Sequence, residues 1–445
     1  MIRAAQRAPL SVLAASGAVL VCAVAVTAYA LRATGRLTGT GVDPLAWLWL
    51  PVALLFVGQT ALFLGARPHR AEGAAREALR RLDVAVLVPV YQEDPGYLSV
   101  GLETFLAQTR PPDSVHVVDD GSTVDYTAVR AWWLAAAAEH GITTTWTRTD
   151  NHGKRRAQCT AAAHCRDADV LITVDSDARL APDALDELLL PFADARVQAV
   201  AGLVLAANNR GGLLARFTDL WYVTLQLVDR SALSALGGVM VTSGSLAAYR
   251  AHVLWDHTDS YLHETFLGRP VTFSDDSLLT LYALTRGRVV QQTSAVVFTA
   301  MPERVGHHLR QYLRWMRGST IRSLWRARHL PVRHPAYVAQ LARWLQQAAY
   351  TLALGWLALA HLHAGRLPSP YLWAVPLLIA ASQTLRYLTV RRSDQTFRSQ
   401  LATWTLTPVA LLWSWVVLRP TRWYAVATCG RTGWGTRRTG PEVAL

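Results

Sequence analysis

The sequence predicts an α/β domain with a mostly parallel β-sheet, set between α-helical transmembrane segments. Long apolar runs flank a central region, in which short β-branched runs alternate with helix-like stretches. Such alternation is typical of βαβ units, which build parallel sheets. Hydrophobic residues make up 51% of the 445 residues and charged residues 17%, which is apolar for a soluble enzyme of this size.

Two apolar runs open the chain, at residues 10–31 and 45–64. Each has close to the ~20 residues that a helix needs to cross a bilayer, which predicts two transmembrane helices within residues 1–66. Arg3 and Arg7 before the first run resemble the start of a signal peptide. The length of that run and the second run directly after it favour a retained helix instead.

Basic residues after the second run predict the topology. They are Arg67, Arg70, Arg76, Arg80 and Arg81. By the positive-inside rule, basic residues beside membrane spans stay in the cytoplasm. The domain of residues 67–300 is therefore expected to be cytoplasmic, in a multi-pass protein of the cell membrane.

The central domain has predicted strands at residues 84–88, 115–118 and 170–174, with helices at 125–139 and 182–191. In open α/β sheets, ligands bind at the carboxyl ends of the strands. Acidic residues follow two of these strands, so we expect them to converge on one crevice.

The C-terminal part predicts further contact with the bilayer. Residues 301–335 are rich in Arg, Trp and Leu, as amphipathic interfacial helices are. Residues 336–392 contain two apolar segments, which predicts two more transmembrane helices. Four arginines within residues 386–398 place that loop inside, and the tail at 429–445 is basic as well. Residues 393–428 therefore start and end inside, which predicts an interfacial or re-entrant segment.

Asp175 and Asp177 follow the strand at 170–174 and are the candidate metal ligands. Mg²⁺ and Mn²⁺ prefer carboxylate and phosphate oxygens, often with one or two protein carboxylates. A metal there would neutralise a departing nucleotide diphosphate. The plain alternative is a surface loop after a strand, where two aspartates are common.

Four residues at strand ends suit a bound nucleotide. Asp119 and Asp120 can accept hydrogen bonds from a base and a ribose, although a DG turn with a capping Ser122 also explains them. Tyr91 and Glu93 follow the first strand and are expected to wall the base pocket.

Lys154 and Arg155 offer two cations to a diphosphate. Lys154 is the only lysine of the chain. A solvated turn is the alternative explanation for this pair.

Asp276 is the candidate catalytic base. Asp275 and Asp276 are adjacent carboxylates that repel each other, so one of them is expected to have a raised pKa suited to general-base work. Such a base takes the proton of an acceptor hydroxyl as that hydroxyl attacks a sugar carbon, and direct displacement inverts the anomeric centre. The competing explanation is a simple helix N-cap.

Gln311, Arg314 and Trp315 are the candidate acceptor and diphosphate residues. Gln311 and Arg314 lie three apart on one helical face, and Trp315 can stack on a sugar ring. Taken alone, the same string would be an ordinary amphipathic helix.

Other features of the composition are less specific. The four cysteines show neither CxxC pairing nor zinc-ligand spacing. The net charge of +13 does not require a nucleic-acid partner, because it fits membrane topology. The sequence leaves the oligomeric state open between a monomer and an oligomer.

Together these motifs resemble the processive family-2 glycosyltransferases, which include cellulose, chitin and hyaluronan synthases. The resemblance covers about residues 80–440 and implies a GT-A-like, nucleotide-sugar-binding fold. Several segments look most like hyaluronan synthases: Gly153-Lys154-Arg155-Arg156-Ala157, Ser243-Gly244-Ser245-Leu246-Ala247-Ala248-Tyr249-Arg250, Arg419-Pro420-Thr421-Arg422-Trp423-Tyr424, and Gly433-Trp434-Gly435-Thr436-Arg437. The resemblance assigns Ser243 to the acceptor site. It assigns Trp434, Gly435, Thr436 and Arg437 to a gating loop.

The resemblance implies a function as well. It implies an inverting β-transferase that uses Mg²⁺ or Mn²⁺, polymerises UDP-N-acetylglucosamine and UDP-glucuronate into hyaluronan, and exports the growing polysaccharide across the lipid bilayer. The alternatives are a chitin or chito-oligosaccharide synthase using UDP-N-acetylglucosamine alone, a transferase that adds one sugar to a lipid carrier, and an export scaffold with a vestigial domain. One departure concerns the acceptor pocket, because the family's GDDR becomes Ser274-Asp275-Asp276-Ser277 and loses a cation beside the base.

Overall fold

The computed structural model of the chain describes residues 3–6, 17, 21, 25, 58–63, 66–364 and 370–433. The two predicted N-terminal spans fall almost wholly outside these residues. The predicted gating residues Trp434, Gly435, Thr436 and Arg437 lie outside them as well.

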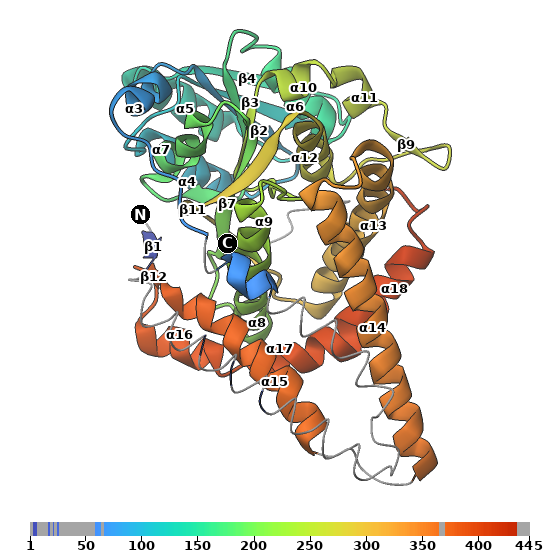
Figure 1. Cartoon of the computed structure of the whole chain (residues 1–445). Helices are drawn as coiled ribbons and strands as arrows, with labels where there is room; N and C mark the ends of the chain where they lie inside the picture. The colour runs from blue at the N-terminus through green and yellow to red at the C-terminus, as the bar shows by residue number, and fades with distance from the viewer. Residues whose placement is uncertain are drawn as a thin grey trace.

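An eight-stranded mixed sheet forms the centre of the α/β domain (Figure 1), in the order β4-β3-β2-β5-β8-β7-β11-β6. Its strands are β2 (Val84–Val90), β3 (Ser114–Asp120), β4 (Thr143–Thr149), β5 (Val170–Thr173), β6 (Arg179–Leu180), β7 (Val197–Ala206), β8 (Ala247–Arg250) and β11 (Arg288–Thr299). Four neighbouring pairs are parallel, as predicted. Strand β8 enters antiparallel between β5 and β7, and β6 is antiparallel at one edge.

Helices cover this sheet. They are α3 (Gly73–Arg80), α4 (Pro95–Leu106), α5 (Thr127–Glu139), α6 (Lys154–Ala162), α7 (Ala184–Leu189), η1 (Leu190–Ala193), α8 (Leu213–Thr224), the π-helix η2 (Leu225–Arg230), α9 (Ser231–Ala235), α10 (His252–Trp255), α11 (Thr258–Leu262) and α12 (Asp275–Arg286). Every residue of β2 and β3 is buried, because helices pack on both faces of parallel strands. A small hairpin of β9 (Thr265–Phe266) and β10 (Arg269–Pro270) projects beyond the sheet.

The C-terminal helices extend away from the domain (Figure 1). They are α13 (Val305–His329), α14 (Pro335–Ala364), α15 (Pro370–Thr384), η3 (Leu385–Thr389), α16 (Phe397–Trp404), α17 (Thr407–Trp413), η4 (Ser414–Leu418) and α18 (Arg419–Ala427). Within the described residues, no individual helix has both the length and the apolar character needed to cross a membrane. Two helical stretches, Phe397–Trp404 and Thr407–Ala427, meet these criteria together and are bent by 42°. The predicted spans and the predicted interfacial segment remain predictions.

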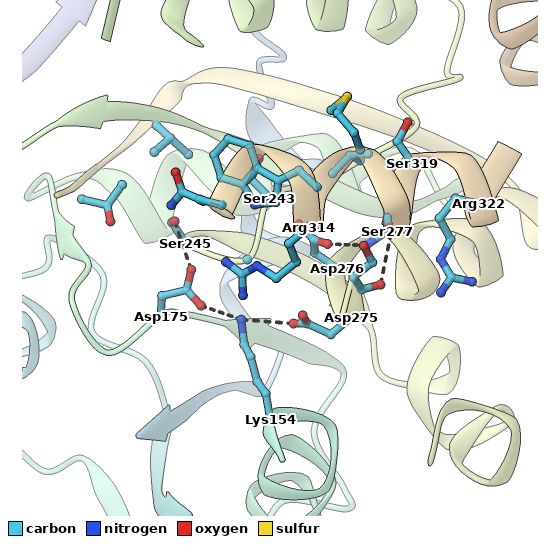
Figure 2. Close-up of a pocket in the computed structure, with 18 of the residues that line it drawn as sticks. Lys154, Asp175, Ser243, Ser245, Asp275, Asp276, Ser277, Arg314, Ser319 and Arg322 are labelled. Carbon is cyan, nitrogen blue, oxygen red and sulfur yellow. Dashed lines mark hydrogen bonds and ion pairs between the residues drawn. The ribbon is translucent and has the colours of Figure 1, made fainter. Parts of the chain in front are cut away.

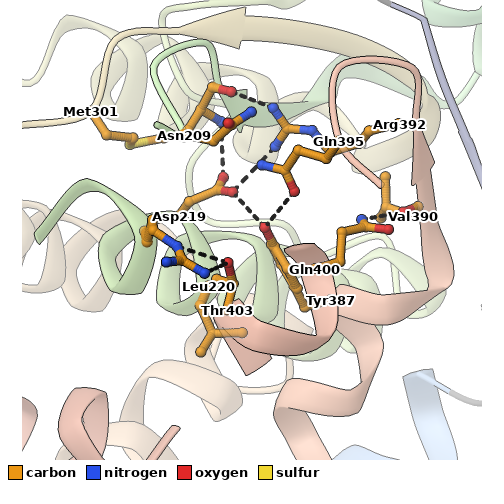
Figure 3. A network of polar contacts seen from close by, with 12 residues as sticks. Asn209, Asp219, Leu220, Met301, Tyr387, Val390, Arg392, Gln395, Gln400 and Thr403 are labelled. Atoms are coloured by element: carbon orange, nitrogen blue, oxygen red, sulfur yellow. Dashed lines mark hydrogen bonds and ion pairs between the residues drawn. The ribbon is translucent and has the colours of Figure 1, made fainter. Parts of the chain in front are cut away.

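A buried polar network joins the loop after α15 to the α/β domain (Figure 3). Arg392 and Asp219 of α8 form an ion pair of 3.2 Å in which both side chains are fully buried. Tyr387 donates a 3.0 Å hydrogen bond to the same carboxylate. Strand β12 (Val390–Arg392) also pairs with β1 (Ala4–Gln6) near the start of the chain. The loop after α15 is therefore held against both the α/β domain and residues 4–6.

Candidate active site

A cavity of about 730 Å³ opens at the carboxyl ends of β2, β3 and β5, where the sequence predicted a crevice. Helices α13, α14 and α18 form its other wall. Eleven of the predicted site residues line it: Tyr91, Glu93, Asp120, Lys154, Asp175, Asp177, Ser243, Asp276, Gln311, Arg314 and Trp315.

Lys154 is the charged centre of this site (Figure 2). Its Nζ lies 2.7 Å from Asp175 Oδ1 and 3.1 Å from Asp275 Oδ2. Burial opposes the charge on Lys154, but the two carboxylates hold its pKa above the ordinary value. Gly244 allows this arrangement, because a Cβ atom at that position would lie 3.0 Å from Nζ and 3.3 Å from the Asp175 carboxylate.

Asp276 has the electrostatics expected of a general base. Burial, followed by repulsion from Asp275, raises the pKa of Asp276 to about 6. Burial alone would raise the pKa of Asp275, but the charge and hydrogen bond of Lys154, together with the charge of Arg155, lower it instead. The two carboxylates thus differ as predicted. The N-cap of α12 is Ser274, at φ 58°, and Asp275 and Asp276 occupy the first helical turn. The N-cap explanation is therefore wrong for the two aspartates.

Asp120 and Asp119 have different roles. Asp120 lines the cavity and accepts hydrogen bonds from the backbone nitrogens of His152 (2.9 Å) and Gly153 (2.8 Å), which fixes the loop before Lys154. Asp119 is buried outside the cavity lining, and its carboxylate accepts a 3.0 Å bond from the backbone nitrogen of Ser122. This bond agrees with the turn explanation for Asp119, and its assignment to the nucleotide stays a prediction.

The side chain of Arg155 is buried outside the cavity lining, and its assignment to the diphosphate stays a prediction. It pairs with Glu264 at 2.8 Å and donates to the carbonyl of Phe273 at 2.8 Å. Successive helical residues point in different directions, so Lys154 faces the cavity while Arg155 turns into the core. Arg155 therefore supports the chain just before the acidic pair.

The carboxylates suit a metal that is shared with a diphosphate. Asp175 and Asp177 both line the cavity, and Asp177 accepts a 2.8 Å hydrogen bond from Thr299. Within the described part of the chain, no cluster of three or more His, Cys, Asp or Glu side chains is arranged to hold an ion. Mg²⁺ and Mn²⁺ are commonly bound by one or two carboxylates plus substrate phosphates, and the residues present fit that arrangement.

Glu93 connects the loop after β2 to the loop after β5. Its Oε2 accepts a 2.7 Å hydrogen bond from Ser176, which lies between Asp175 and Asp177. The residue that was expected to wall the base pocket therefore also orients the loop that carries the two candidate metal ligands.

The part of the cavity beside Trp315 contains two residues that the sequence analysis missed. Tyr222 of α8 stacks on Trp315, with ring centroids 5.9 Å apart and planes inclined by 18°. Its hydroxyl lies 3.1 Å from Ser243 Oγ, which also accepts a 2.7 Å bond from Arg230. Arg230 ends the π-helix η2, and π-helical turns often occur at functional sites. No sequence motif identified this segment, since it reads as an ordinary apolar helix.

Comparisons with known proteins agree with this geometry. A family model described as "Glycosyltransferase like family 2" matches residues 81–318. A hyaluronan synthase of Streptococcus pyogenes is 32% identical over 363 residues, covering 80% of this chain and 83% of that protein. The chain belongs to glycosyltransferase family 2.

Two other similarities concern this family-2 glycosyltransferase. An N-acetylglucosaminyltransferase of Rhizobium meliloti is 31% identical over 400 residues, covering 88% of this chain and 91% of that protein. The mannosyltransferase PcManGT from Pyrobaculum calidifontis, solved with GDP-Man and Mn²⁺, has a TM-score of 0.56 at 23% identity and covers 87% of this chain. The latter similarity supports the GT-A-like fold.

Proposed function

We propose that this glycosyltransferase is a membrane-embedded, processive hyaluronan synthase. It would take UDP-N-acetylglucosamine and UDP-glucuronate as donors, invert the anomeric centre and export the polymer. The similarity to a hyaluronan synthase over 80% of the chain supports this choice of product. The predicted transmembrane segments and the cytoplasmic position of the domain belong to the same proposal.

The observation that carries polymer formation is the length of the cavity along α13. Gln311, Trp315, Ser319, Arg322 and Arg326 all line it, at the spacing of one helical face. The 15 helical steps from Gln311 to Arg326 span about 22 Å. This length accommodates a donor sugar and several units of a saccharide, whereas transfer of one sugar to a lipid needs less room.

In the proposed mechanism, the donor binds at the strand ends beside Tyr91 and Asp120. Lys154 neutralises the diphosphate, while Gln311 and Arg314 position it together with the acceptor end. A divalent metal bound by Asp175 and Asp177 would supply further charge neutralisation on the diphosphate. The gating loop at residues 434–437 is proposed to cover the nucleotide.

Asp276 would take the proton from the acceptor hydroxyl. A raised pKa of about 6 leaves Asp276 mostly ionised at neutral pH and a better proton acceptor than an ordinary aspartate. Trp315, stacked on Tyr222, offers a face for the acceptor sugar ring.

The test is polymer synthesis in isolated membranes, supplied with each UDP-sugar separately and with both together. We expect high-molecular-weight product with both donors, and digestion of that product by hyaluronidase. Asp276→Asn membranes are the control for background activity.

A second candidate is a chito-oligosaccharide synthase, which the similarity to the rhizobial N-acetylglucosaminyltransferase favours. Product from UDP-N-acetylglucosamine alone, resistant to hyaluronidase, would replace the first proposal with this one.

A further inference from the structure

Positive charge gathers on the helical wall of the cavity. We call four side chains that line it the arginine wall: Arg230 of η2, Arg326 of α13, Arg343 of α14 and Arg422 of α18. They come from four different helices, so the fold rather than a local motif brings them together.

Most of the arginine wall has neutral partners. Arg343 pairs with Asp229, which lies beside Arg230 on the π-helix. Arg230 donates instead to Ser243 and Gln226, and the guanidinium of Arg422 lies over the ring of Trp344 at 5.4 Å. Among the described residues, Arg343 is thus the one member of the arginine wall with an ion-pair partner, and the other three guanidinium groups contact neutral groups.

Arg326 is the most constrained member. It is 4% exposed and bonds to the side-chain oxygen of Gln340 and the carbonyl oxygen of Met240, both of which are uncharged. Burial, together with the nearby Arg343 and Arg322, lowers its pKa to about 9. A buried cation without a counter-charge is costly, so an anion that enters the cavity would be attracted to this position.

One short segment relates the wall to the reacting groups. The carbonyl of Met240 accepts from Arg326, Ser243 Oγ accepts from Arg230, and Ser245 Oγ donates to Asp175 at 3.2 Å. Residues 240–245 thus contact the arginine wall at one end and the candidate metal carboxylate at the other. Arg326 therefore contacts one end of this segment and Asp175 the other, while Arg230 contacts Ser243, two residues before Ser245.

We propose that the arginine wall is a subsite for the carboxylate of an anionic sugar in the growing chain. Guanidinium groups suit this ligand because their donors match a carboxylate in geometry. This inference rests on the proposed function, since a chitin-like chain has no carboxylate. Such a subsite would let the enzyme select a uronate-containing polymer through the growing chain, independently of how it recognises the donor.

The experiment measures binding of fluorescent hyaluronan oligosaccharides to the full-length protein in detergent, with chito-oligosaccharides of equal length as the neutral probe. Arg422→Gln and Arg326→Gln should each raise the Kd for the hyaluronan probe at least tenfold. Binding of the neutral probe and of UDP should change less than twofold. Arg328→Gln is the matched control, because Arg328 is exposed on the same helix, outside the cavity lining.

Three outcomes separate the possibilities. If both probes bind the wild type equally, and added salt weakens neither, the subsite does not exist. If UDP affinity falls as much as hyaluronan affinity in both variants, the arginines serve the diphosphate and the inference is wrong. Arg422 is half-buried and keeps the test valid if Arg326→Gln does not fold. Failure of the proposed function would appear separately, as polymer made from UDP-N-acetylglucosamine alone.

Discussion

The ammonium group of Lys154 donates a 2.7 Å hydrogen bond to Asp175, the first carboxylate after β5. The same nitrogen lies 3.1 Å from Asp275 in the first turn of α12. One cation therefore links the nucleotide side of the site to the helix that carries the proposed base, Asp276. Its charge lowers the pKa of Asp276, against burial and the charge of Asp275, which raise it.

The pH dependence of transfer follows from this balance. The base acts in its ionised form, so the initial rate in the wild type should fall as the pH drops through about 6. Lys154→Met removes a charge that favours ionisation of Asp276, so its acid limb should move to higher pH. UDP release at saturating donor between pH 5 and 8.5 measures both profiles. Arg156→Met, an exposed change on the same helix α6, should keep the wild-type profile. An unchanged limb in Lys154→Met would contradict the assignment.

Asp276→Asn should remove polymer synthesis while UDP still binds. The amide is similar in size but cannot accept the proton, and loss of a general base typically costs about 10²–10⁴-fold in rate. The measurement pairs single-turnover transfer with UDP affinity by calorimetry. Asp259→Asn, at a carboxylate that is 95% exposed, is the control and should retain full activity. A variant that still polymerised at more than a tenth of the wild-type rate would exclude Asp276 as the base.

The sequence predicted the parts of the site that depend on strand ends. Asp120, Asp175 and Asp177 follow buried β-branched runs, and parallel strands present their carboxyl ends along one edge. Asp119 and Arg155 lie outside the cavity lining, because alternation along a strand and rotation along a helix turn adjacent side chains away from each other. Two neighbouring residues of a sequence motif can therefore face different surroundings in the fold.

The missed residues have a different physical cause. Arg230 reaches the cavity from the π-helix that continues α8, and the register of a π-turn is not visible in hydrophobic periodicity. Tyr222 lies in α8 itself, within a stretch that no motif marks. The antiparallel β8 was also missed, since its four residues end the Ser243 segment rather than a βαβ unit.

Gly318 of α13 should tolerate no side chain. A Cβ atom there would lie 1.7 Å from Oγ of Ser274, the residue before Asp275. Gly318→Ala must therefore shift α13 or the start of α12, and misplacing reacting groups by about 1 Å can cost ~10²-fold in rate. Transfer rate, with thermal unfolding as a check on folding, measures the effect.

Two further variants test the cause of that loss. Gly306→Ala is the control on the same helix, where the Cβ atom would meet Arg310 Nη1 at 3.5 Å. Ser274→Gly removes the clashing oxygen and suits the left-handed backbone at φ 58°. The double variant Ser274→Gly/Gly318→Ala should recover most of the activity. If it does not, the contact between these two residues is not the reason for the loss.

The ion pair between Asp219 and Arg392 should stabilise the attachment of the C-terminal helices. Both side chains are fully buried, and removing one partner leaves an uncompensated charge that typically costs about 3–5 kcal/mol. Arg392→Gln should therefore lower the unfolding midpoint far more than the adjacent exposed Arg391→Gln, which should stay within ~0.5 kcal/mol. Unfolding of the detergent-solubilised protein, followed by tryptophan fluorescence, gives both values.

The double variant Asp219→Asn/Arg392→Gln distinguishes the pair from general packing. Neutralising both partners removes the unpaired charge at Asp219, although Asp394, which also pairs with Arg392, keeps its carboxylate. The combined loss should therefore be smaller than the sum of the single losses. Asp219 also lies one helical turn before Tyr222 on α8, the residue that stacks on Trp315. Arg392→Gln should consequently raise the KM for an oligosaccharide acceptor while UDP affinity stays unchanged. Additive losses, or an equal loss of UDP affinity, would show that the network holds the fold without positioning the acceptor side.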